Sequence, residues 1–299
     1  MNTEIKARSQ KSEVRSQRQE KILHLASCIL LLASCLLLFT SIVFASEDFR
    51  KRKPQAKESF TADEDIKAEI VFGRELSARI LGRYQLYDYK KLTLYINLVG
   101  KGVAQYAGRP EIEFRFAVLD TDIINAFAAP GGYIFITKGA LKIMEDEAEL
   151  SAVLAHEIAH VTERHIVQEL NIKGTEDSPA AGLARILGGG TETMRVVFTQ
   201  MVDKAVEILF EKGLKRQDEL NSDRIATITA ANAGYDPAAL KRYFEKISNR
   251  EEKTEILTGT HPSFGERIDN IDSFLTKNQL SDKKQPFLKE RFNENVKIR

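Results

Sequence analysis

The chain has 299 residues, 43% of them hydrophobic and 29% charged, which is enough for one sizeable hydrophobic core or two small ones. Its formal net charge of +1 provides no global field that would attract nucleic acid. Both cysteines, Cys28 and Cys35, lie in one apolar run near the amino end, so the remainder has neither a disulfide framework nor a cysteine metal site.

Residues 1–45 are predicted to direct the chain to a membrane. Residues 1–21 carry six basic and three acidic side chains, and residues 22–45 are nearly uncharged and long enough to span a bilayer. The positive flank would keep the amino end in the cytoplasm, which places the folded part in the periplasm or cell envelope. A signal peptide cleaved after Ala45 and a retained membrane anchor both stay open, with lipidation at a cysteine as a third alternative. Residues 46–60 are charged and aperiodic, as in a linker.

The folded domain is predicted to span residues 61–278, followed by a charged tail over 279–299. Apolar residues recur at helical spacing at both ends of the domain, and residues 111–119 alternate as in a half-buried strand. Two further short strands are predicted on either side of the turn signal Pro130-Gly131-Gly132. Helices are predicted over 63–81, 87–106 and 193–232, from Asp236 onward and from Ser263 onward, and strands over 111–119, 123–128 and 133–137. This pattern is typical of a mostly helical α+β domain with a small sheet. The glycine-rich stretch 172–192 is either a surface connection or a lid over a cleft.

The most informative stretch is His156-Glu157-Ile158-Ala159-His160, an H-E-x-x-H motif within an apolar helix. Two histidines four residues apart project from the same side of a helix, so their imidazoles can bind one Zn²⁺ ion. The glutamate between them is placed to act on water at the metal as a general base. A solvated helix face is the alternative, but the other faces of this helix carry apolar or small residues, and a buried polar face needs a partner.

A catalytic zinc site needs a third protein ligand and an open position for water. His165 would lie on the opposite, apolar side of the motif helix, so we expect it to be structural. A carboxylate from another helix is therefore favoured. Glu219 and Asp223 share one helix face, where the first can bind the metal and the second can accept a hydrogen bond from a ligand imidazole. Taken alone, this spacing is also common on solvated faces.

Several runs of the chain together resemble the M48 family of zinc metalloproteases, which includes Ste24-, HtpX- and Oma1-like proteases and the periplasmic BepA/LoiP group. These runs are Asn125-Ala126-Phe127-Ala128-Ala129-Pro130-Gly131-Gly132, Ile136-Thr137-Lys138-Gly139, Glu147-Ala148-Glu149-Leu150 and the H-E-x-x-H motif. The resemblance covers roughly residues 65–276. It implies a zincin-like (gluzincin) fold with a small sheet beside the motif helix, and one Zn²⁺ per chain.

The resemblance also implies roles by position. The metal ligands and the outer aspartate that it implies are His156, His160, Glu219 and Asp223. Ser222 stands where the family commonly has alanine. His261 and Arg267 match a late His-Pro and Arg motif over the cleft. Arg267 would stabilise the oxyanion at the scissile carbonyl, and His261 would either assist it or close on the zinc as a fourth ligand.

The function that the resemblance implies is a zinc endopeptidase of the bacterial cell envelope that hydrolyses unfolded or misassembled proteins in quality control. An exposed sheet edge would hold an extended substrate by main-chain hydrogen bonds, and the residues expected there are Asn125, Ala126, Phe127, Gly132, Tyr133 and Ile134. The alternative is a non-proteolytic envelope assembly factor or chaperone on the same zinc-binding scaffold. A CAAX-type intramembrane protease is excluded, because it needs several membrane spans and one such segment is predicted. The helical repeats of BepA are not predicted here.

Overall fold

The computed structural model describes residues 63–172, 192–249, 261–283 and 285–298, which belong to one unit, Glu58–Arg299. The predicted targeting segment 1–45, the linker 46–60 and the candidate lid 172–192, apart from its two end residues, lie outside the described residues. The helices are α2 (Asp63–Arg83), α3 (Lys90–Ala104), α4 (Lys138–Ile143), α5 (Glu147–Thr162), α6 (His165–Glu169), α8 (Glu192–Glu207), α9 (Arg216–Asn232), α10 (Ala239–Ser248), α12 (Phe264–Lys277) and α13 (Lys289–Asn295), with a π-helical turn η1 (Ile208–Lys212). The strands are β1 (Arg115–Leu119), β2 (Ala126–Ala129) and β3 (Tyr133–Thr137). Among these helices, none is both long and apolar enough to cross a membrane.

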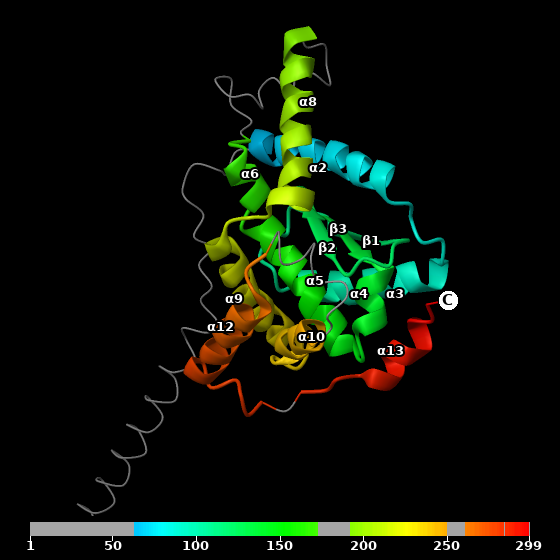
Figure 1. Ribbon diagram of the computed structural model, residues 1–299, viewed down its shortest axis with the longest axis vertical. Coiled ribbons are helices and arrows are strands. Elements are labelled where there is room, and N and C mark those ends of the chain that lie inside the picture. Colours follow the sequence, from blue (N-terminus) through cyan, green and yellow to red (C-terminus); the bar gives the residue numbers. More distant parts are fainter. Residues whose placement is uncertain (1–62, 173–191, 250–260, 284, 299) are drawn as a thin grey trace, which may run out of the picture. The chain divides into compact units, whose positions relative to one another are not determined.

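Three strands form one sheet in the order β1-β3-β2 (Figure 1). β1 pairs with β3 in parallel, and β2 pairs with β3 antiparallel, placing Ala129 opposite Tyr133. β3 is therefore the central strand, with a partner on each side. The expectation that Tyr133 and Ile134 lie at an exposed edge is wrong, because strand order is set by pairing between distant segments. Gly132 lies in the turn before β3, where its carbonyl accepts a hydrogen bond from the Arg115 N–H at 2.8 Å, so it is not at an exposed edge either. The mostly helical α+β class with a small sheet beside the motif helix is confirmed.

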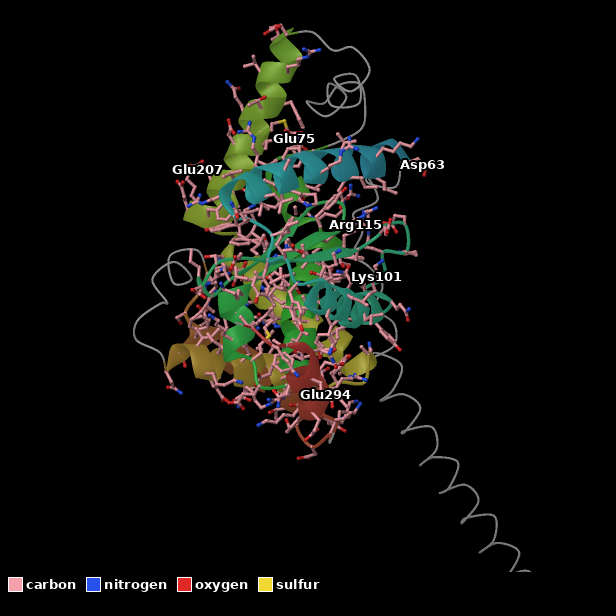
Figure 2. All side chains as sticks on the ribbon, turned by 90° about the vertical axis from the view of Figure 1, so that its right-hand side faces the viewer. Asp63, Glu75, Lys101, Arg115, Glu207 and Glu294 are labelled. Carbon is pink, nitrogen blue, oxygen red and sulfur yellow. The ribbon has the colours of Figure 1, made fainter. Side chains whose placement is uncertain are left out.

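Helices cover both faces of the sheet. α2 lies on one side, and α3 and α5 lie on the other, in both Figure 1 and Figure 2. At Gly73 of α2, an added Cβ atom would come within 1.6 Å of the Pro130 carbonyl oxygen in the β2–β3 turn. In that turn Gly131 has φ 75°, a backbone conformation open to glycine without steric cost. These glycines let α2 rest directly on the turn that the Pro-Gly-Gly sequence predicts.

α5, which carries the H-E-x-x-H motif, is the central helix of the domain and packs along α9. Every residue from Glu147 to Val161 is buried. The helix begins at Asp146, whose side chain accepts a hydrogen bond from the Glu149 backbone N–H at 2.9 Å. Glu147 and Glu149 lie in its first turn, where negative charge interacts favourably with the helix dipole. The motif therefore lies on a helix that is capped and enclosed.

The helical periodicity over 193–232 does not correspond to one helix. α8 ends at Glu207, η1 follows, and Gly213 has φ 74° before α9 begins at Arg216. Side chains disfavour this φ, so glycine permits the change of direction there. The break separates α8, which packs on α2, from α9, which packs on α5.

The observed start of α12 agrees with the prediction from the sequence, whereas α10 starts a few residues later than predicted. α10 begins at Ala239, slightly later than predicted, and Asp236 still accepts a hydrogen bond from the Ala238 N–H at 3.2 Å. α12 begins after Ser263, where the sequence predicts it, and the Ser263 hydroxyl oxygen accepts a hydrogen bond from the Glu266 N–H at 3.3 Å, which is one of the two bonds of a capping box.

The predicted charged tail contains α13, which packs near the start of α5. Phe292 of α13 is 3% exposed, and Arg291 donates two hydrogen bonds to the Glu147 carboxylate. The hydroxyl groups of Tyr95 and Tyr235 donate to the same carboxylate at 2.8 and 2.7 Å. The carboxyl-terminal segment therefore stabilises the first turn of the motif helix.

Candidate metal centre

The motif helix directs both of its histidines and its glutamate into one buried site. His156, Glu157 and His160 are 4%, 7% and 7% exposed. Nε2 of His156 and Nε2 of His160 lie 3.0 Å apart, with the ring planes inclined by 81°. Because the two residues are one helical turn apart on the same face, their nitrogens converge on one point.

α9 brings a carboxylate to that point. Glu219 is fully buried, with Oε2 3.6 Å from His156 Nε2 and Oε1 3.5 Å from His160 Nε2. A tetrahedral zinc ion with bonds of about 2.0–2.1 Å holds its ligand atoms about 3.3–3.4 Å apart. The two imidazole nitrogens are 3.0 Å apart, and each lies 3.5 or 3.6 Å from a different oxygen of the Glu219 carboxylate. One ligand atom from each of the three side chains lies within 4.8 Å of the other two, so the three can bind one zinc ion with small adjustments.

The hydrogen bonding of Glu219 also favours a metal ion at this position. Within the described part of the chain, its Oε1 atom is buried and has no hydrogen-bond partner. Leaving such a group unsatisfied costs about 1–3 kcal/mol or more. Among the described residues, one group of three potential metal ligands has all its ligand atoms within 4.8 Å of one another, and it consists of His156, His160 and Glu219. These residues fit a single metal ion with three protein ligands.

The outer side of His156 is held by a buried ion pair. Asp223 Oδ1 lies 3.0 Å from His156 Nδ1. Arg267 of α12, 3% exposed, donates from Nε to Asp223 Oδ2 at 2.9 Å and from Nη2 to Oδ1 at 2.6 Å. Its guanidinium carbon lies 4.1 Å from the centroid of the Phe244 ring. Asp223 thus lies behind the imidazole, where the sequence placed it, and the guanidinium of Arg267 is engaged with Asp223.

The outer side of His160 faces His165, whose predicted position is wrong. α5 ends at Thr162, and Arg164 adopts a left-handed conformation with φ 59° and ψ 36°, so α6 begins at His165 in a new direction. His165 Nδ1 lies 2.9 Å from His160 Nδ1, and His165 is 6% exposed. No glycine or proline marks this break, so the sequence carried no signal for it.

Burial and the neighbouring charges shift the pKa values of the three side chains that could bind the metal. Burial and the charge of Arg267 lower the pKa of His156, but hydrogen bonds with Asp223 and Glu219 outweigh them and raise it to about 9. Burial holds the pKa of His160 well below its usual range. Burial alone would raise the pKa of Glu219, but the charges of His261 and His160 lower it well below its usual range. A neutral His160 and an ionised Glu219 are the forms that bind a metal, whereas His156 has to release its proton when the metal binds.

Two cavities lie beside the site, and Glu157 lines each of them. Burial raises the pKa of its carboxyl group to about 7, although the positive charge of His156 opposes this. A group with a pKa near the operating pH both accepts and returns a proton efficiently. Glu157 therefore has the position and the proton affinity of a general base.

His261 lies on the more open side of the site. Its Nδ1 is 2.7 Å from Glu219 Oε2, and its side chain is 20% exposed. It borders the same two cavities as Glu157. The structure therefore brings the His-Pro motif, distant in sequence, to the carboxylate of the metal-binding group.

β2 provides the sheet edge nearest to Glu157. Asn125–Phe127 contribute to the walls of the two cavities that Glu157 borders. At the opposite edge, the side chain of Asn97 donates to the Phe116 carbonyl at 2.6 Å and accepts from the Phe116 N–H at 3.2 Å. Of the expected substrate-binding residues, Asn125–Phe127 therefore lie beside the site, whereas Tyr133 and Ile134 belong to the central strand and Gly132 to the turn before it.

Apolar walls flank the site on both sides, and the sequence did not assign them. Around one cavity they include Val153, Leu240, Tyr243, Phe244 and Ile247, and around the other Ile208, Leu209 and Leu214. They come from α5, α10, η1 and the segment after η1. Which helices border the site depends on tertiary packing, so no local pattern marks these residues.

The comparisons with known proteins agree with this arrangement. Peptidase family M48 matches residues 90–275. The beta-barrel assembly-enhancing protease of Escherichia coli (strain K12) is 29% identical over 219 residues, covering 66% of this chain and 42% of the relative. The mitochondrial metalloendopeptidase OMA1 of Schizosaccharomyces pombe is 28% identical over 206 residues, covering 67% and 58%, and the human mitochondrial metalloendopeptidase OMA1 is 26% identical over 175 residues, covering 56% and 33%.

The chain spans 42% of the Escherichia coli relative and 58% of the fission yeast one, so it matches a part of each. The matched part, residues 90–275, contains the H-E-x-x-H helix, Glu219 and Arg267. Because this match covers more than half of the sequence, the chain belongs to peptidase family M48, a family of metalloproteases.

Proposed function

We propose that the chain is a zinc endopeptidase of the bacterial cell envelope that hydrolyses peptide bonds of unfolded or misassembled proteins. The observation that carries this proposal is the convergence of His156, His160 and Glu219, with Glu157 beside them on a cavity wall. Three protein ligands leave a position for water, as in catalytic rather than structural zinc sites. Membership of a peptidase family and the printed names of the relatives support the same activity.

In the proposed mechanism, His156, His160 and Glu219 hold one Zn²⁺, which when bound lowers the pKa of a water molecule towards about 7 and polarises the scissile carbonyl. Glu157 accepts a proton from this water and delivers it to the leaving amine. The edge of β2 binds the substrate main chain as an added strand. Because main-chain hydrogen bonds tolerate many sequences, this mode suits substrates that are unfolded.

His261 and Arg267 have different places in this mechanism. His261 borders the cavities with Glu157, so it can donate a hydrogen bond to the oxyanion at the scissile carbonyl. Arg267 directs two hydrogen bonds to Asp223, which contacts His156 Nδ1. Arg267 also lines one of the cavities that Glu157 and His261 border, so we assign to it the positioning of His156 through Asp223 and keep, as a second proposed role, the oxyanion stabilisation that the resemblance implies.

The test is the substitution Glu157→Gln in the full chain, assayed on an unfolded test protein. The variant should keep the zinc content of the wild type and lose hydrolysis, because an amide cannot accept the proton. In the wild type, a chelator should abolish cleavage and added Zn²⁺ should restore it. A Glu157→Gln variant that cleaves as fast as the wild type would refute the assigned base.

The second candidate is a non-proteolytic envelope assembly factor that uses the metal only for structure. The observation that favours it is the 2.7 Å contact between His261 Nδ1 and Glu219, which brings a further imidazole to the site. If His261 completed the coordination permanently, no position would be left for water. Under this second proposal, the wild type would not cleave the test protein, and His261→Ala would also be inactive and would bind zinc more weakly. The protease proposal instead expects chelator-sensitive cleavage by the wild type.

The envelope location rests on residues 1–45, which lie outside the described residues. Their basic start and apolar continuation favour export or anchoring to the membrane through residues 22–45. Mass spectrometry of the mature protein extracted from membranes would distinguish a cleaved signal peptide, a retained anchor and a lipidated cysteine. Recovery of the intact chain from the soluble cytoplasmic fraction would contradict the location.

A further inference from the structure

We propose that His165 is a positioning residue for His160. It accepts the Nδ1 hydrogen of His160 and so fixes the tautomer and ring orientation that direct His160 Nε2 to the metal. This inference rests on the proposed function, since it concerns the same metal site. It adds a residue that neither the motif nor its spacing assigns.

The chain path places His165 behind His160. Because Arg164 takes a left-handed conformation directly after α5, the chain changes direction there, and His165, the first residue of α6, lies against the motif helix. The ring centroids of His160 and His165 lie 5.0 Å apart with the planes inclined by 69°, and the two Nδ1 atoms are 2.9 Å apart. This distance and the burial of both rings indicate a hydrogen bond rather than a loose contact.

The hydrogen positions follow from what each nitrogen faces. His160 Nε2 points to His156 Nε2 and to Glu219 Oε1, so its lone pair must be free for the metal. A neutral imidazole then carries its hydrogen on Nδ1. Since a hydrogen bond needs one donor and one acceptor, His165 Nδ1 accepts, and the hydrogen of His165 lies on Nε2. That atom is 3.8 Å from Asp218 Oδ1, a carboxylate that attracts the N–H dipole.

Both metal-binding histidines thus have an outer partner: Asp223 of α9 contacts His156 Nδ1, and His165 of α6 contacts His160 Nδ1. Asp218 lies near His165, but at 3.8 Å it is beyond hydrogen-bond distance and contributes only an electrostatic attraction. Outer partners of metal-ligating histidines fix the tautomer, and losing one typically weakens metal binding about 10–100-fold.

The competing explanation is that His165 only fills space at the end of α5. Two polar substitutions separate these explanations. In His165→Asn, the amide oxygen can occupy the place of Nδ1 and accept the hydrogen bond, whereas in His165→Gln it lies further out, nearer the place of Nε2. Both variants keep a polar group of moderate size in the same pocket, so they form a matched pair.

The experiment measures the Zn²⁺ affinity of the full chain by competition with a chelator, and the Tm of the metal-free protein. His165→Asn should keep most of the wild-type affinity. His165→Gln and His165→Leu should lose about 10–100-fold. Val167→Ala, a buried change on the same short helix, should lower the Tm without changing the affinity.

Two results would overturn the inference. One is a wild-type affinity in His165→Gln and His165→Leu, and the other is an equal loss in His165→Asn and His165→Gln, which would indicate packing alone. A folded wild type that binds no Zn²⁺, or a Glu219→Gln variant that binds it as tightly as the wild type, would instead refute the proposed metal site itself. The two failures are therefore distinguishable.

Discussion

The buried pair of Asp223 and Arg267 provides a quantitative test of how the site is held together. The substitution Arg267→Met removes two charge-assisted hydrogen bonds, at 2.9 and 2.6 Å, and leaves a fully buried carboxylate behind. Such bonds contribute about 1.5–3 kcal/mol each. Breaking a buried ion pair on one side costs about 3–5 kcal/mol, so we expect the free energy of unfolding to fall by this amount.

A double-mutant cycle identifies the pair as the cause. Asp223→Asn should be costly too, but the double variant should lose less than the sum, because no unpaired charge remains. We expect a coupling of about 2–3 kcal/mol, as for groups in one network. The assay is urea unfolding of the metal-free variants at pH 7, followed by circular dichroism. Additivity within about 0.5 kcal/mol would refute the reasoning.

The same pair sets the direction of a pH dependence. Burial would raise the pKa of Asp223, but the charge of Arg267 outweighs burial and lowers it. A lowered folded-state pKa contributes stability above the unfolded value of about 3.9, and this contribution is lost as the pH falls further. In Arg267→Met, burial without the guanidinium raises the pKa of Asp223, so the stability difference between wild type and variant should begin to shrink at a pH above about 4 and continue to fall on further acidification.

Three further predictions concern the ligand, the base and the carboxyl-terminal helix. Glu219→Ala should weaken Zn²⁺ binding by more than the about 10–100-fold typical of an outer partner, and unchanged binding would place the third ligand elsewhere. Hydrolysis should decline as the pH falls below about 7, because burial raises the pKa of Glu157 to about 7 and the base must be ionised; a rate that rises on acidification would contradict its role. Phe292→Ala should lower the free energy of unfolding by about 3 kcal/mol, since Phe292 is 3% exposed, while the exposed Glu290→Ala serves as control; equal stability of the two variants would show that α13 does not stabilise the domain.

Local features of the fold were predictable because the deciding signals lie within a few residues. The alternation over 111–119 contains β1, the short apolar run 133–137 matches β3, and Ser263 caps the start of α12. His156 and His160 had to converge, since helix geometry fixes the relation of residues four apart. Their approach to Glu219, by contrast, was suggested by resemblance, because it depends on the packing of α9 against α5.

What the sequence could not show depends on backbone breaks and distant pairing. A continuing helix would carry His165 away from the site, and a non-glycine residue, Arg164, makes the turn that brings it back. The one glycine of a long periodic stretch, Gly213, separates α8 from α9, but a lone glycine is also tolerated within helices. The edge position of β2 follows from strand order, which no single strand encodes.

The metal dependence of hydrolysis tests the central claim most directly. The full chain, stripped with a chelator and then titrated with Zn²⁺, would be assayed for cleavage of an unfolded protein. Activity should be absent at the start and should saturate at one equivalent of zinc per chain. Full activity in the stripped protein, with no dependence on added zinc, would contradict the account.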